Sequence, residues 1–229
     1  MSVLITRPEP DASRSAAAFA AAGIEVVCAP ILFIAPRGDR PHPPEDAVLA
    51  FTSANGVRAY RAAGGPPRPA WCVGPITAAA AEEAGLAVAG VAGGDVASLA
   101  ARIASAAPPR VLHVRGVHAA GALTEALAQQ GIRADAAPLY EAVPAPALPD
   151  AAAAALRAGA DVALYSPRSA RHFSDLVRAA GLGEATARAR LLALSEAVAA
   201  ACALPFAEVF VPPLPNGSAF VDFLSGRRT

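Results

Sequence analysis

Two serine-rich turns hold the residue types in this sequence that are best suited to binding an anion. The first carries Ser53 and Asn55 after a short apolar run, and the second carries Ser166 and Arg168 after a similar run. A helical pattern follows each turn, so these side chains would lie at a helix N-terminus, where free N–H groups bind carboxylates or phosphates. A serine in this place is also a common N-cap, and capping and ligand binding both stay open for Ser53.

Two arginines occupy comparable places after other apolar runs. Arg7 follows residues 3–5, and Arg115 follows residues 111–114. A guanidinium binds a carboxylate through two parallel hydrogen bonds, so both arginines are candidates for contact with an acidic ligand. The open alternative for each is an ion pair at the surface or between domains. Ser195 also follows a predicted strand, and there we favour helix capping over ligand binding.

Short apolar strands alternate with helical segments along the chain, which is typical of parallel sheets covered by helices on both faces. In such folds ligands bind at the carboxyl ends of the strands, which is where the serines and arginines above would lie. Two proline-rich stretches, residues 36–44 and 144–149, interrupt this alternation. We interpret both as crossings between domains.

The chain also repeats itself, in the order a, b, a′, b′. Residues 3–34 resemble residues 111–142, and residues 47–104 resemble residues 161–224. The first pair aligns without a gap and matches Arg7 with Arg115, Gly23 with Gly131, and Pro30 with Pro138. Such a repeat predicts two related α/β halves, either as tandem domains or in a crossed arrangement in which a pairs with b′ and b with a′.

The composition argues against several functional classes. The chain has 229 residues and a formal net charge of zero, whereas proteins that bind nucleic acid usually carry a basic excess. No apolar run reaches the roughly 18–20 residues that a membrane span needs, and the N-terminus does not resemble a signal peptide. The cysteines Cys28, Cys72 and Cys202 lack a metal-binding spacing, so we expect a reducing cytosol and no metal site.

A set of short motifs resembles the uroporphyrinogen-III synthase family over essentially the whole chain and in the family's order. The resemblance implies two flavodoxin-like three-layer α/β lobes with parallel sheets, one lobe inserted in the other, joined by a two-stranded connection. It therefore selects the crossed arrangement. The motifs are ITRP, FTSANGV, VGPITA, HVRG, Pro-Leu-Tyr, YSPRSA and ALSEAVAAA. The implied bounds are residues 1–34 and 148–229 for lobe 1, 38–142 for lobe 2, and 35–37 and 143–147 for the crossings.

The resemblance implies a cyclising hydro-lyase of tetrapyrrole (haem) biosynthesis, which needs no cofactor. Its substrate is linear hydroxymethylbilane, closed in the cleft between the lobes with loss of water and inversion of ring D. Helix N-termini would bind the carboxylates of this substrate without a net positive charge. The resemblance further implies a cytoplasmic monomer, with no nucleic-acid or membrane partner and a transient contact with the preceding pathway enzyme. The alternative is a non-catalytic two-lobed binding or sensor protein for a small anionic ligand.

The family motifs also imply roles for single residues. Arg7, Thr77 and Arg115 match the arginine of ITRP, the threonine of the VG-x-x-TA motif and the arginine of the RG motif. Tyr140 aligns with the family's tyrosine at the end of a lobe, and we expect it to assist departure of the hydroxyl as a weak general acid. Its alternative is an aromatic that packs at the hinge. Tyr165 is the competing phenol, for which core packing is favoured.

Two places depart from the family pattern. Leu214 stands where relatives carry a threonine in the tail turn, so the backbone or Asn216 is the expected ligand contact there. The segment 117–121 lacks the further arginine that the family often has after the RG motif. It holds His118 instead, for which we expect no catalytic role.

Overall fold

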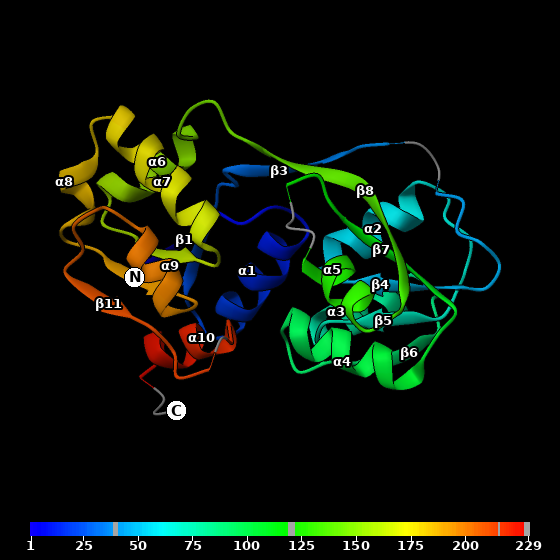
Figure 1. Ribbon diagram of the computed structural model, residues 1–229. Coiled ribbons are helices and arrows are strands. Elements are labelled where there is room, and N and C mark those ends of the chain that lie inside the picture. The colour runs from blue at the N-terminus through cyan, green and yellow to red at the C-terminus, as the bar shows by residue number, and fades with distance from the viewer. Residues whose placement is uncertain (39–40, 119–121, 215, 227–229) are drawn as a thin grey trace. The chain divides into compact units, whose positions relative to one another are not determined.

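The computed structural model describes residues 1–38, 41–118, 122–214 and 216–226 and shows an α/β protein with two sheets (Figure 1). Contacts within the chain divide it into two compact units. The first comprises Met1–Phe33 and Val143–Thr229, and the second comprises Ile34–Ala142. The second unit is therefore inserted in the first along the chain, as the family resemblance implied.

The first unit has a 5-stranded parallel sheet in the order β11-β10-β9-β1-β2. Counted along the chain within the unit, this is the 2-1-3-4-5 order of flavodoxin-like folds. The strands are β1 (Ser2–Ile5), β2 (Glu25–Cys28), β9 (Asp161–Leu164), β10 (Arg190–Ala193) and β11 (Glu208–Phe210).

Helices cover both faces of this sheet because its strands alternate apolar residues between two cores. Val3 and Ile5 pack with α1 and α10, whereas Leu4 packs with α6, α7 and α9. The helices of the unit are α1 (Asp11–Ala21), α6 (Asp150–Arg157), α7 (Pro167–Ala179), α8 (Gly183–Thr186), α9 (Glu196–Ala201) and α10 (Ser218–Leu224).

The second unit contains most of a 6-stranded sheet in the order β3-β8-β7-β4-β5-β6, in which the strands from β8 to β6 are parallel. Helices α2 and α3 cover one face around Phe51, and α4 and α5 cover the other around Ala50. The strands are β3 (Leu32–Pro36), β4 (Ala47–Phe51), β5 (Ala70–Cys72), β6 (Val88–Val91), β7 (Arg110–Gly116) and β8 (Arg133–Pro144). The helices are α2 (Ala54–Ala62), α3 (Pro75–Glu83), α4 (Val96–Ala106) and α5 (Ala122–Gln129).

Strands β3 and β8 form the two-stranded connection, since the division between the units falls within both of them. Their pairing is antiparallel: Ala145 N–H donates to the Ile31 carbonyl at 2.9 Å, and Arg37 N–H donates to the Leu139 carbonyl at 2.8 Å. A proline such as Pro138 is a local signal against a continuous strand. The structure has one strand instead, because the ladder accepts Pro138 opposite Arg115 and shifts register at the next step.

The strand neighbours also decide between the two arrangements that the repeat permitted. β1 pairs with β9 and β7 pairs with β4, so a joins b′ and a′ joins b. In both sheets the parallel strands then have the same order when the strands of segment a or a′ are counted first. The two serine-rich turns consequently lie in different units, Ser53 in the second and Ser166 in the first.

Candidate functional sites at the carboxyl edges

Each parallel sheet has one edge formed by the carboxyl ends of its strands, where α/β folds bind ligands. All the residues predicted to form the site lie at such an edge or in the turn that follows it. The structure groups them in two sets, one on each unit. The first unit holds Arg7, Ser166, Arg168, Ser195 and Asn216, and the second holds Ser53, Asn55, Thr77, Arg115 and Tyr140.

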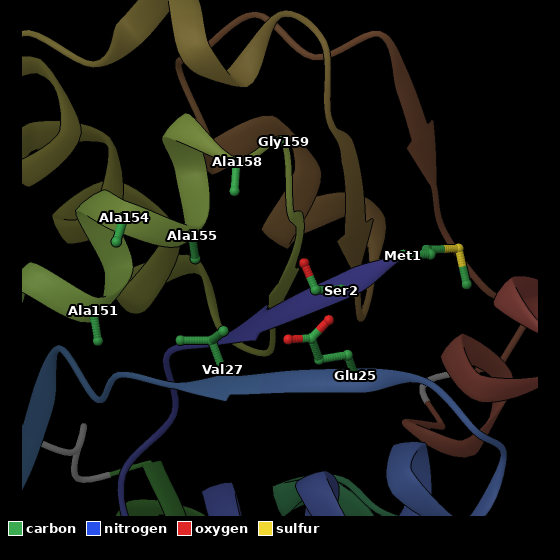
Figure 2. Close-up of a pocket in the computed structure, with 9 residues that line it drawn as sticks. All are labelled: Met1, Ser2, Glu25, Val27, Ala151, Ala154, Ala155, Ala158 and Gly159. Atoms are coloured by element: carbon green, nitrogen blue, oxygen red, sulfur yellow. The ribbon is translucent and has the colours of Figure 1, made fainter.

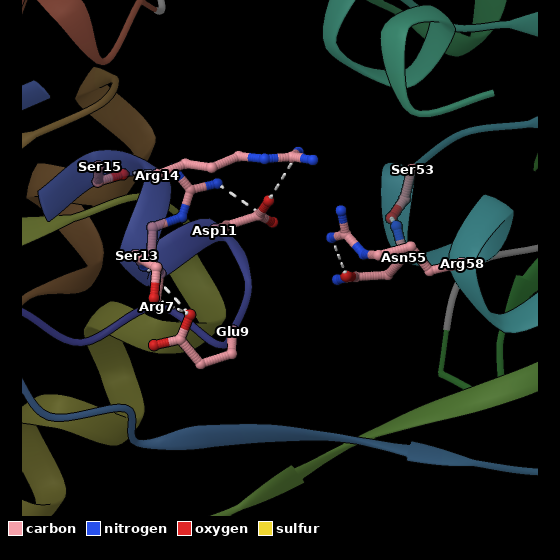
Figure 3. Close-up of polar contacts among 9 residues, drawn as sticks. All are labelled: Arg7, Glu9, Asp11, Ser13, Arg14, Ser15, Ser53, Asn55 and Arg58. Carbon is pink, nitrogen blue, oxygen red and sulfur yellow. Dashed lines mark hydrogen bonds and ion pairs between the residues drawn. The ribbon is translucent and has the colours of Figure 1, made fainter. Parts of the chain in front are cut away.

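The N-terminus of α2 presents hydrogen-bond donors. Ser53 Oγ caps the helix by accepting from Asn55 N–H at 3.0 Å, which leaves the hydroxyl hydrogen available. Arg58 Nη2 donates to Asn55 Oδ1 at 2.5 Å (Figure 3). Because Asn55 accepts through its oxygen, its amide NH₂ group remains a donor for a ligand. Ser53 is therefore a cap, and the same helix end is also chemically suited to a carboxylate. The sequence prediction had not included Arg58.

Tyr140 stands on the same face of the second sheet as α2. It pairs with Gly116 of β7. Gly116 lies two residues after Val114, on the face of β7 that packs against α2. A Cβ at Gly116 would lie 3.0 Å from Tyr140 Cε2 and 3.4 Å from its hydroxyl oxygen, so glycine makes room for the ring there. Among the described residues the Tyr140 hydroxyl has no hydrogen-bond partner, so it is free to donate to a ligand.

Thr77 lies in the first turn of α3, and its side chain is largely enclosed. The residue is 5% exposed, and its N–H donates to the Gly74 carbonyl at 3.1 Å. The neighbouring Ile76 is 70% exposed. A ligand at this turn would therefore meet Ile76 before the Thr77 hydroxyl.

Arg115 extends from the opposite face of β7, together with His113. His113 is 2% exposed, and its Nε2 lies 3.2 Å from Thr52 Oγ1. Its Nδ1 is buried without a hydrogen-bond partner among the described residues. Burial, and secondarily the charge of Arg115, lower the pKa of His113 to about 4. His113 is therefore neutral at pH 7, and it joins β7 to the turn that carries Ser53.

Arg7 is engaged by groups of its own unit. Its Nη2 lies 3.5 Å from Asp11 Oδ2, its Nη1 donates to Ser15 Oγ at 3.2 Å, and its guanidinium carbon lies 4.3 Å from the centre of the Tyr165 ring. Figure 3 shows the pair of Arg7 with Asp11 at the start of α1. The ion pair that the sequence left open for Arg7 is present, and it lies within the first unit.

The N-terminus of α7 differs from that of α2. Ser166 Oγ accepts from Ser169 N–H at 3.1 Å and lies 2.8 Å from Ser169 Oγ, which in turn donates to the Ser166 carbonyl at 2.9 Å. Both hydroxyls are thus satisfied inside the turn. Arg168 is exposed at the same helix end.

Ser195 and Asn216 complete the edge of the first unit. Ser195 has the N-cap position of α9, but its side chain makes no capping bond, so the expected capping interaction is absent. Asn216 Oδ1 accepts from Ser218 N–H at 3.0 Å. Asn216 and the exposed Leu214 line a shallow pocket of about 220 Å³. Residue 215 of this tail turn lies outside the described residues.

Sequence reasoning missed a chain of polar contacts around Glu141 in the second unit. Glu141, next to Tyr140, accepts from Arg37 Nε at 2.7 Å, and its other oxygen lies 3.1 Å from His118 Nε2. Hydrogen bonds from His118 and Arg37 hold the pKa of Glu141 below its usual value. The three residues are far apart in sequence, so no local pattern could have indicated their contact. Residues 119–121, in the segment that differs from the family pattern, lie outside the described residues.

A larger open pocket of about 620 Å³ lies elsewhere in the first unit (Figure 2). It is lined by alanines of α6 and by Ser2 and Glu25 at the amino ends of β1 and β2, so it contains none of the predicted site residues. The described residues include no cluster of His, Cys, Asp and Glu with the makeup of a metal site. No helix among the described residues is both long enough and apolar enough to cross a membrane.

The fold and the groups at its sheet edges define a class: a two-unit flavodoxin-like α/β protein with hydrogen-bond donors at the carboxyl ends of both sheets. The particular family follows from the sequence match. The model of the family described as "Uroporphyrinogen-III synthase HemD" matches residues 13–222. The chain therefore belongs to the uroporphyrinogen-III synthase family, which confirms the resemblance and favours the synthase interpretation over the binding-module alternative.

Solved structures of similar fold carry the same family name. Uroporphyrinogen-III synthetase from Helicobacter pylori has a TM-score of 0.66 and 16% identity, over 99% of this chain and 99% of that one. A mutant uroporphyrinogen III synthase from the extremely thermophilic bacterium Thermus thermophilus has a TM-score of 0.55 and 18% identity, over 99% of this chain and 98% of that one. At such low identity the likeness shows the fold, and it confirms the predicted fold class. No curated protein sequence matches the chain.

Proposed function

We propose that this protein is a cyclising hydro-lyase that closes linear hydroxymethylbilane to uroporphyrinogen III, with loss of water and inversion of ring D. The observation that carries the proposal is the family match over residues 13–222. The geometry that supports it is the donor-rich end of α2, with Ser53 and Asn55, on the same face of the sheet as the unpartnered hydroxyl of Tyr140.

The carboxyl edges supply the kind of groups that a polycarboxylate needs. At the second edge these are the Ser53 hydroxyl and the side-chain amide of Asn55, since the N–H groups of Asn55 and Gly56 already donate to Ser53. At the first edge the hydroxyl of Ser195 makes no capping bond, and Arg168 is exposed. Uncharged N–H and O–H donors bind carboxylates without a basic surface, which agrees with the formal net charge of zero.

The proposed chemistry requires little of the protein beyond positioning and one proton donor. The Tyr140 phenol passes its proton to the departing hydroxyl as the carbon–oxygen bond breaks, so the hydroxyl leaves as water. The phenolate then takes up the proton that ring closure releases from the attacked pyrrole. The remaining groups hold the bilane so that the substituted position of ring D attacks. Restricting a flexible substrate to one reactive conformation is a large source of rate and selectivity. Without that restriction, closure occurs without inversion.

The isomer ratio of the product tests the proposal. The bilane is generated by the preceding pathway enzyme, the purified chain is added, and the products are separated after oxidation. We expect a large excess of the type III isomer over the enzyme-free control. If only the type I isomer forms, as in that control, the synthase function is wrong. Binding of the bilane without turnover would then favour the sensor alternative.

The remaining implications of the family pattern are part of the same proposal. They are the domain bounds 1–34 with 148–229 and 38–142, a monomeric state, a cytoplasmic location, and a transient contact with the preceding enzyme. Light scattering during size-exclusion chromatography, with and without that enzyme, tests the monomer and the contact. A stable dimer at micromolar concentration would contradict the monomeric state.

A further inference from the structure

The guanidinium of Arg7 is held from several sides at the carboxyl edge of the first sheet. Asp11 and Ser15 from α1 contact its two terminal nitrogens, at 3.5 and 3.2 Å. The ring of Tyr165, directly after β9, lies 4.3 Å from its central carbon. An arginine on an aromatic face loses freedom of rotation but keeps hydrogen-bond donors in the guanidinium plane, so the stack orients it for a further acceptor.

Tyr165 is itself held by a second aromatic ring and by the tail turn. Its ring centre lies 5.5 Å from that of Phe220, and a Cβ on Gly217 would lie 3.5 Å from its Cε1. Burial raises the pKa of the Tyr165 phenol, so the ring stays neutral and adds no charge beside Arg7. Gly217 follows Asn216, so one ring supports both Arg7 and the tail turn. Tyr165 therefore belongs only partly to the core that the sequence favoured for it.

We propose that Tyr165 is a positioning residue that holds the Arg7 guanidinium in the orientation in which Arg7 binds a carboxylate of the substrate. The identity of that ligand rests on the proposed function. Tyr165 takes no part in bond making or breaking. Its contribution is to the affinity for substrate, since a prepositioned side chain loses less rotational freedom when the ligand arrives.

Steady-state kinetics of matched variants test this role. Tyr165→Leu removes the aromatic face, and we expect KM to rise about five-fold with kcat changed less than about two-fold, because ground-state binding is lost. Tyr165→Phe keeps the face and should restore most of the affinity. Ser15→Ala, a mild change on a half-buried helix position, should raise KM about two-fold. Phe223→Leu is the control, because it removes a second arginine–aromatic stack of the unit's described residues, with Arg190 at 5.6 Å.

A double-mutant cycle decides whether Tyr165 acts through Arg7. In an Arg7→Ala background, Tyr165→Leu should leave KM unchanged within about 1.5-fold, because the group that it positions is gone. An equal rise of KM in both backgrounds overturns the proposal, and so does a Tyr165→Phe variant as weak as Tyr165→Leu. Circular dichroism and thermal unfolding establish that each variant is folded.

A measurement without turnover separates this proposal from the proposed function. The order parameter of the Arg7 Nε–H group from ¹⁵N relaxation should be high in the wild type and fall clearly in Tyr165→Leu, with Arg7→Lys assigning the signal. An unchanged order parameter overturns the positioning role. If Tyr165→Leu does not fold, the same measurement on Ser15→Ala and Tyr165→Phe decides. A wild type that makes only the type I isomer overturns the function but leaves this readout intact.

Discussion

The N-termini of α2 and α7 are repeats of one motif, and yet they present different hydrogen-bonding groups. In both, a serine caps the helix, Ser53 at α2 and Ser166 at α7. At α7 the third residue after the cap is Ser169, which closes the turn on itself through two hydroxyl contacts. At α2 that place is Gly56, where a Cβ would come within 3.1 Å of the Val114 carbonyl, so the turn stays open.

The next difference lies two residues after the cap. Asn55 at α2 has its amide oriented by Arg58, whereas the equivalent residue at α7 is the exposed Arg168. The second edge also has Tyr140, with a hydroxyl that has no partner among the described residues, while Arg7 on the first edge is already paired with Asp11. The repeated cap is therefore structural, and the residues beside it decide how each helix N-terminus meets a ligand. We therefore expect the second edge to carry the proton donor.

The largest expected effect comes from removing the phenol of the second edge. Tyr140→Phe should lower kcat about 100-fold with little change in KM, because a general acid is lost while the ring still packs against Gly116. Single-turnover formation of the type III isomer measures this. The matched control is Tyr60→Phe, which removes a buried hydroxyl that donates to the Pro66 carbonyl at 2.7 Å in the same unit. Full turnover by folded Tyr140→Phe would remove the proton donor from the second edge.

His113 should make the second unit sensitive to acid. Its pKa is lowered to about 4, so the unfolded state takes up its proton near pH 6.5 while the folded state resists. The stability that the neutral ring contributes is present above pH 6.5 and is lost as the pH falls toward 4, by about 2–3 kcal/mol. The repeat places the apolar Ile5 at the equivalent position of the first unit.

Urea unfolding at pH 7 and pH 4.5 measures this loss. His113→Asn should show a smaller loss between the two pH values than the wild type, whatever its stability at pH 7. His42→Asn serves as a histidine control in the same unit. Identical pH dependence of the wild type and His113→Asn would show that folding does not lower the pKa of His113.

A negative charge at the N-terminus of α2 should weaken substrate binding by a smaller factor. Asn55→Asp places a carboxylate among donors that we propose bind carboxylates, and KM should rise about 10-fold through like-charge repulsion at a helix N-terminus. The matched change on the first unit, Arg168→Gln, should raise KM about two-fold, since an exposed guanidinium contributes little. Equal effects of the two changes would contradict the asymmetry of the edges.

The smallest effect separates capping from binding. Ser53→Ala and Ser166→Ala should each lower the free energy of unfolding by about 1 kcal/mol, because each removes an N-cap. Only Ser53→Ala should also raise KM, by about three-fold, because Ser166 is satisfied inside its own turn. Thermal unfolding and steady-state kinetics measure the two quantities. A larger rise of KM in Ser166→Ala than in Ser53→Ala would reverse the comparison.

Much of the fold could be predicted because its determinants are local. Apolar runs, helix-ending glycines such as Gly23 and Gly131, and capping serines each indicate one element, and the repeat relates the halves. The fused strand β8 was missed because Pro138 is a local signal against a strand. The ladder accepts it there, since a register shift follows directly at Gly116. The capping bond expected of Ser195 was wrong for a similar reason, because occupying the N-cap position does not ensure that the hydroxyl turns toward the helix.

The α/β class, the two serine-rich turns and the family to which the chain belongs follow from the sequence alone. These depend on residue types within a few positions or on ordered motifs, both of which can be read along the chain. The folded chain adds three contacts: Arg58 orients Asn55, Arg7 rests on Tyr165, and Glu141 joins His118 to Arg37. Most of these are contacts between distant residues, and even the near pair Asn55 and Arg58 depends on rotamers. Packing sets such contacts, and no local pattern encodes it.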